Sequence, residues 1–200
     1  MAIIEALASK PSGLTRTQLL NLLASKDGGT FSRILTELED SGFIKLEYPF
    51  QKKVKNGIYR IIDQYSLFYL KFLKQKPWTG PGSWISRIDS PGWSAWSGYA
   101  YESICLLHLD EIKKALGITG VYTEAVSWLD TNRSVQVDLL IDRRDHIINL
   151  CEVKFTQEQF VLTKAGREDI KKKITIFKED VKTRKTIFPT LITTFGINEN

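Results

Sequence analysis

Two apolar segments that follow each other closely constrain the fold of this chain most. Val135–Asp142 reads VQVDLLID, with apolar side chains at alternate positions, and Ile147–Phe155 is almost entirely apolar. Alternation with a period of two is typical of a strand with one buried face, and a short apolar run suits a strand buried on both faces. Because only Arg143–His146 separates the two segments, we expect two consecutive strands joined by a turn.

The neighbouring segments extend this pair into an α/β domain. We expect a long helix over 96–116 that ends at Gly117, a strand over 121–128, a basic helix from Lys164 to about Lys178, and a last strand over 186–194. The first three strands can form a meander, and the second helix carries the chain to the fourth strand. The pattern therefore predicts a mixed four-stranded sheet.

Charged residues interrupt both apolar strands. Asp138 lies within VQVDLLI and Glu152 within INLCEVKF, with Lys154 two residues further on. A charge in an apolar strand is costly unless it is paired, hydrogen-bonded or bound to a metal. An Asp and a Glu on adjacent strands offer the hard oxygen ligands that Mg²⁺ prefers, and a lysine beside them can orient a water or stabilise negative charge. The pattern predicts a Mg²⁺ or Mn²⁺ site.

The turn length decides whether the two carboxylates meet. Directly opposed residues on antiparallel strands point the same way, so a symmetric four-residue turn over 143–146 would place Asp138 opposite Cys151. For Asp138 to join Glu152, the turn must have an odd length or a β-bulge must intervene. We expect one or the other.

The first part of the chain has a different organisation. The order is three short helices and then two strands joined by a basic hairpin, which is the order of a winged helix-turn-helix. The expected helices cover 3–9, 15–24 and a stretch after the N-cap Thr30, the strands cover 43–47 and 58–62, and the hairpin between them carries Lys52, Lys53, Lys55 and Asn56-Gly57.

The distribution of charged residues neither requires nor excludes DNA binding by either part of the chain. Residues 1–76 hold 12 Lys and Arg against 7 Asp and Glu, whereas the remainder holds 16 of each. Arg33 and the hairpin lysines favour phosphate contacts, but Glu37 and its acidic neighbours on the third helix oppose them. The alternative is that this region packs against a neighbouring domain. Lys171 and Lys172 of the basic helix either follow a phosphate backbone or form a solvated face.

Two domains follow from these patterns, 1–62 and 95–200, joined over 63–94 by a connecting helix (63–75) and a Pro/Gly-rich linker. No segment reaches the roughly 18–20 apolar residues that span a bilayer. Cys105 and Cys151 lack metal-ligand spacing and are expected to be buried free thiols. These features favour a cytoplasmic protein without membrane contact.

Asp138, Glu152 and Lys154 in this layout resemble the motif of the PD-(D/E)XK nuclease-like superfamily, the restriction-endonuclease-like fold. The resemblance implies that Asp138 and Glu152 bind Mg²⁺ and that Lys154 assists phosphodiester hydrolysis. Glu102, in GYAYESICL, matches a further metal-binding Glu that many members carry on the first core helix. The proline of the motif name is replaced by Val137.

The whole chain also resembles the C-terminal half of bacterial and archaeal AAA-type ATP-binding proteins, through WSAWSGYAYESICLLH, IKKALGI, VQVDLLIDRRDHIINLCEVKF and LITTFGINEN. That resemblance implies an ATPase domain before this region as a partner. The G-x-x-x-x-G-K-[ST] phosphate loop is absent from the sequence, so we expect no ATP site of that type. Two functions stay open: a Mg²⁺-dependent DNA endonuclease, or a non-catalytic module that recognises DNA or a protein. A nucleophilic enzyme finds little support, since neither His108 nor His146 has an evident Ser or Cys partner.

Overall fold

The computed structural model describes residues 1–50, 57–74, 80, 85–88, 90–130, 132 and 135–198. The chain divides into two compact units: Met1–Tyr48 with Lys52–Tyr99, and Pro49–Gln51 with Ala100–Asn200. The short piece around Phe50 belongs to the second unit because its backbone N–H donates to the Ser127 carbonyl (2.8 Å) and its ring packs 6.0 Å from that of Phe177. The sequence placed the later boundary at 94/95, whereas the units divide at Tyr99/Ala100.

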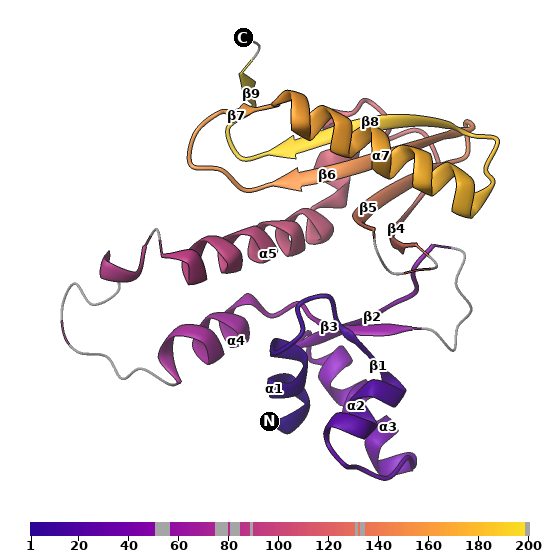
Figure 1. Cartoon of the computed structure of the whole chain (residues 1–200). Coiled ribbons are helices and arrows are strands. Elements are labelled where there is room, and N and C mark those ends of the chain that lie inside the picture. The colour runs from indigo at the N-terminus through magenta and orange to yellow at the C-terminus, as the bar shows by residue number, and fades with distance from the viewer. Residues whose placement is uncertain are drawn as a thin grey trace. The chain divides into compact units, whose positions relative to one another are not determined.

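The first unit combines short helices with a three-stranded antiparallel sheet of order β1-β3-β2 (Figure 1). Its core includes Leu7, Leu19, Leu35 and Ile44, each at most 2% exposed. The elements are α1 (Ala2–Ala8), β1 (Leu14–Thr15), α2 (Arg16–Leu22), α3 (Gly29–Asp40), β2 (Ile44–Glu47), β3 (Ile58–Ile61) and α4 (Gln64–Phe68).

Local capping explains where these helices begin. Thr15 caps α2, and its side chain and that of Gln18 form a capping box. Helix α3 begins at Gly29 rather than after Thr30, because the Gly28 carbonyl already accepts a helical hydrogen bond from the Ser32 N–H at 3.1 Å. Gly42 follows α3 with φ of +72°, the left-handed conformation that a glycine after a helix end adopts at little cost.

Two connecting helices differ from the expectation. After α4 the backbone forms a π-helical turn over Tyr69–Leu73, and Gln75, the expected end of this helix, lies outside the described residues. Helix α5 (Pro91–Leu107) begins within the expected linker, because the Ser90 hydroxyl accepts from the Trp93 N–H and a proline suits the first helical position. The long helix breaks at His108, whose backbone leaves the helical region (φ −112°, ψ 40°), and α6 (Leu109–Ala115) follows.

The second unit contains a mixed four-stranded sheet of order β4-β5-β6-β8. Strands β4, β5 and β6 form the expected antiparallel meander, and α7 carries the chain to β8, which pairs parallel to β6 with Pro189 opposite Leu150. The prediction of a mixed four-stranded sheet is confirmed. The elements are β4 (Thr123–Leu129), β5 (Gln136–Arg143), β6 (Ile147–Lys154), β7 (Phe160–Val161), α7 (Lys164–Val181), β8 (Thr186–Thr193) and β9 (Ile197–Asn198), of which β7 and β9 pair with each other.

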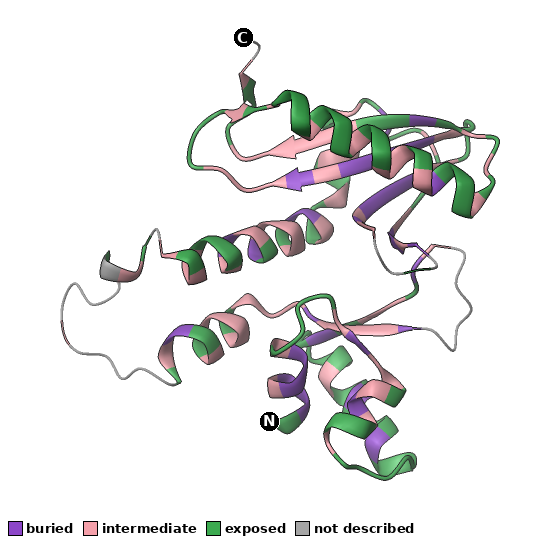
Figure 2. Ribbon diagram, viewed as in Figure 1, coloured by how far each residue is buried: buried purple, intermediate pink, exposed green. Residues whose placement is uncertain are grey.

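Both faces of this sheet are covered. On one face, Trp128 and Leu140 pack with Phe177 of α7, and the Trp128 and Phe177 rings meet edge to face at 5.1 Å. A second cluster joins Leu139 and Cys151 to side chains of α6. Figure 2 shows the buried centres of β5 and β6 and the exposed outer side of α7. In the described part of the chain, no helix is long and apolar enough to cross a membrane.

Candidate active site

A three-residue turn joins β5 to β6 and sets their register. The turn covers 144–146, and His146 adopts a left-handed backbone (φ +65°), as in a three-residue hairpin that ends in a left-handed residue. Asp142 pairs with Ile148 and Leu139 with Cys151. Continued by one step, this register places Asp138 across from Glu152. The expectation of an odd-length turn is confirmed.

Strand β5 is irregular at the same point. Val126 of β4 pairs with Leu140, but Trp128 pairs with Val137, so β5 has one extra residue between these pairs. Val137 and Leu140 accordingly share one core cluster, and Asp138 and Leu139 lie between them. Such bulges redirect a side chain and are frequent beside active sites.

Glu152 is nearly buried and its two carboxylate oxygens hold different ammonium groups. Oε1 lies 2.7 Å from Nζ of Lys154, and Oε2 lies 2.7 Å from Nζ of Lys173 on α7. The side chain of Glu152 is 13% exposed and that of Lys173 19%, whereas Lys154 is 45% exposed. Burial alone would raise the pKa of Glu152, but the bonds from the two lysines outweigh it and hold that pKa below its ordinary value.

Asp138 belongs to the same charged group as Glu152, Lys154 and Lys173. Its Oδ1 accepts a hydrogen bond of 2.6 Å from Nε2 of Gln136, two residues earlier on β5. Burial lowers the pKa of Lys173, but Glu152, with smaller contributions from Asp169 and Asp138, raises it above its ordinary value. Both predicted carboxylates therefore act on one ammonium group, and the structure brings Asp138, Glu152 and Lys154 together.

Glu102 is half-buried on α5, and its charge adds to burial in raising the pKa of Cys105, three residues along the same helix. Within the described residues, no group of three or more Asp, Glu, His and Cys side chains is arranged to hold a metal ion. The structure thus does not place Glu102 in a metal-ready cluster with Asp138 and Glu152.

The predicted phosphate-binding residues that the structure describes are exposed. Arg33 makes an exposed ion pair with Glu37 at 3.6 Å, and Lys171 pairs with Glu168 at 2.9 Å. Lys172 is exposed on α7. Lys52, Lys53 and Lys55 lie outside the described residues. The contact between Lys173 and Glu152 was missed by sequence reasoning. Lys173 is three residues after Ile170 and four before the buried Phe177, a spacing that places it beside the inward face of α7 and is a signal that could have identified it.

Both cysteines are buried and free, as expected. Burial is the main cause that raises the pKa of Cys151 to about 12, and it also raises that of Cys105. Because the thiolate is the reactive form, we expect neither thiol of the native protein to react with an aromatic disulfide reagent at pH 8, whereas both react once the chain is unfolded in urea. Rapid labelling of either thiol in the native protein would contradict this burial.

The charged group can perform limited chemistry with its own atoms. Asp138 and Glu152 supply carboxylate oxygens, and Lys154 and Lys173 supply ammonium groups that can attract a phosphate. Only Lys154 combines this position with substantial exposure, so it is the cation free to turn toward a substrate. Comparison with protein-family models, curated proteins and solved structures found no match to this chain.

Proposed function

We propose that the second unit is a metal-dependent nuclease of the PD-(D/E)XK type that hydrolyses phosphodiester bonds in DNA. The observation that supports it best is the register of β5 and β6, which puts Asp138 across from Glu152 with Lys154 beside it. Asp138 and Glu152 would hold Mg²⁺ or Mn²⁺, and the metal would activate a water and neutralise phosphate charge.

The donor set fits such a metal under one condition. Both oxygens of Glu152 hold ammonium groups at 2.7 Å, and these charges would repel a metal cation, so we expect one lysine to move away when a metal binds. Lys154 can leave because nearly half of its side chain is exposed and solvent can hydrate its ammonium. Once displaced, Lys154 would contact the attacking water or the scissile phosphate, while Lys173 keeps Glu152 ionised and oriented.

The first unit would serve DNA binding in this proposal. Its three short helices α1–α3 and the β2–β3 pair follow the order of a winged helix, in which α3 would meet the major groove. Helix α3 holds Arg33 against three acidic residues, and Arg33 is paired with Glu37, so affinity would depend mainly on other basic groups of the unit.

A non-catalytic module is the second candidate. The saturation of Glu152 by Lys154 and Lys173 favours it, because a carboxylate paired on both oxygens can stabilise the sheet and α7 without any metal. On this view the nuclease-like sheet and the winged helix recognise DNA or a protein partner, such as an ATPase domain.

Cleavage assays with Asp138→Asn decide between the candidates. We expect the wild-type protein to cleave plasmid or single-stranded DNA with Mn²⁺ or Mg²⁺, and Asp138→Asn to be slower by about 100-fold or more, since a lost metal ligand removes charge stabilisation. Titration calorimetry with Mn²⁺ should show binding to the wild type and none to the variant. Asp145→Asn, which removes a carboxylate from the exposed turn, is the matched control and should keep full activity. A folded wild-type protein that binds no Mn²⁺ with DNA present and cleaves neither substrate would favour the non-catalytic module.

A further inference from the structure

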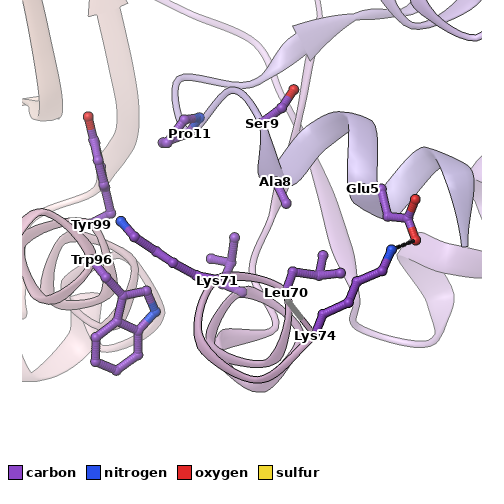
Figure 3. A pocket seen from close by; sticks show the side chains of 10 residues that line it. Glu5, Ala8, Ser9, Pro11, Leu70, Lys71, Lys74, Trp96 and Tyr99 are labelled. Carbon is purple, nitrogen blue, oxygen red and sulfur yellow. Dashed lines mark hydrogen bonds and ion pairs between the residues drawn. The ribbon is translucent and has the colours of Figure 1, made fainter. Parts of the chain in front are cut away.

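A cavity of about 590 Å³ lies within the first unit, between α1, the π-helical turn and the first half of α5 (Figure 3). Its size falls within the range of about 300–1,000 Å³ that small-molecule sites occupy. Ala8, Leu67, Leu70 and Trp96 give it apolar walls, and Tyr99 closes one side. The Trp96 ring is fixed by edge contacts with Phe68 and Phe72, at 5.6 and 5.8 Å, so this wall is rigid.

The charges around the cavity do not cancel. Lys74 forms an ion pair of 2.6 Å with Glu5, which neutralises both side chains. Lys71 leaves the π-helical turn in another direction, toward α5, where Trp96 and Tyr99 lie (Figure 3). Among the described residues Lys71 has no carboxylate partner. Its Nζ lies over the Phe72 ring, 6.0 Å from the ring centroid. Among the described lining residues, the cavity therefore has one more positive than negative charge, at an apolar wall.

The backbone beside this charge is unusual. Lys71 occupies the π-helical turn Tyr69–Leu73, and such turns are rare and frequently found at functional sites. Desolvation by the surrounding protein lowers the pKa of Lys71, although the side chain is exposed, so the neighbouring protein disfavours its charged form. An anion bound beside Nζ would stabilise that charged form.

From the cavity, its apolar walls and the unpaired Lys71, we propose that the first unit binds a small organic anion with a flat apolar body. The body would lie against Trp96 and Leu70, and a carboxylate, phosphate or sulfonate group would accept from Nζ of Lys71. This site is independent of the nuclease proposal, because it lies in the other unit and shares no residue with Asp138 or Glu152.

A pair of fluorescent probes with the same rings tests the proposal on the full chain. The first is 1-anilinonaphthalene-8-sulfonate, and the second is N-phenyl-1-naphthylamine, which lacks the sulfonate. We expect the wild type to bind the sulfonate probe the more tightly. Lys71→Met keeps an unbranched side chain of similar length and removes the charge. It should lower the affinity for the sulfonate probe by about tenfold and leave the affinity for the neutral probe unchanged. Lys26→Met, on an exposed residue outside the cavity, should change neither.

A second variant locates the binding. Ala8→Phe fills the cavity from the α1 side and should abolish binding of both probes, with circular dichroism showing that the fold is kept. Equal affinity of wild type and Lys71→Met for the sulfonate probe would overturn the proposal. So would undiminished binding to a folded Ala8→Phe protein, or failure of the wild type to bind the sulfonate probe. Small aromatic carboxylates and phosphates are then added as competitors of the sulfonate probe, and the order of their affinities identifies the preferred head group.

Discussion

Replacing Phe177 by alanine is expected to lower the free energy of unfolding of the second unit by about 3–5 kcal/mol. Phe177 is fully buried on α7 and packs in the core between that helix and the sheet: its ring meets Trp128 edge to face and Phe50 at 6.0 Å. The substitution removes apolar area and leaves a cavity under rigid neighbours that cannot collapse into it.

Urea unfolding followed by circular dichroism measures this loss. Phe177→Leu keeps most of the volume and should cost about half as much or less. Phe195→Ala is the matched control, since this phenylalanine is 59% exposed and its loss should change stability by no more than about 0.5 kcal/mol. A cost below about 1 kcal/mol for Phe177→Ala would mean that α7 is not held to the sheet by this side chain.

Glu152→Gln is expected to destabilise the protein by about 2–3 kcal/mol at pH 7. The amide cannot balance the charges of Lys154 and Lys173, and the largely buried Lys173 would be left with the more distant carboxylate of Asp169 at 3.7 Å. The value lies below that of a fully buried pair because solvent reaches Lys154. Glu168→Gln removes an exposed carboxylate from the same helix as Lys173 and should cost little.

The same contacts predict how stability depends on pH. The pKa of Glu152 is lower in the folded than in the unfolded chain, so the folded state binds fewer protons in this range. The stabilisation by Glu152 is therefore complete above the unfolded pKa, about 4.3, and is lost as pH falls through the folded pKa. The difference in unfolding free energy between wild type and Glu152→Gln should shrink below pH 4, and a difference that stays constant with pH would contradict an ionised Glu152.

A double-mutant cycle of Glu152→Gln and Lys173→Met measures how much of the stabilisation by Glu152 comes from its pair with Lys173. If Lys173 contributes most of the stabilisation, the double variant should be more stable than the sum of the single effects predicts, by about 1–2 kcal/mol. An additive result would show that Glu152 and Lys173 do not stabilise each other.

The sequence was most informative where local pattern and final environment agree. The period of two in β5 and the apolar run of β6 predicted a hairpin, and a charged residue in each strand predicted that Asp138 and Glu152 would interact with other groups. The positions of Lys173 and of the helix break at His108 depend on how α7 and α6 pack on the sheet, which local pattern does not contain. Pro91 was misinterpreted for a simpler reason, because proline is as typical of a first helical position as of a linker.

Pro189 has a consequence for how these molecules behave at high concentration. Strand β8 is the last in the order of the four-stranded sheet, and an outer strand can recruit a strand from another copy through its unused backbone groups. Proline has no N–H to donate, so a recruited strand would lose a hydrogen bond near the middle of β8. This edge of the sheet is thereby protected against growing from one molecule into the next, and Pro189→Val should favour aggregation without adding any new contact inside the fold.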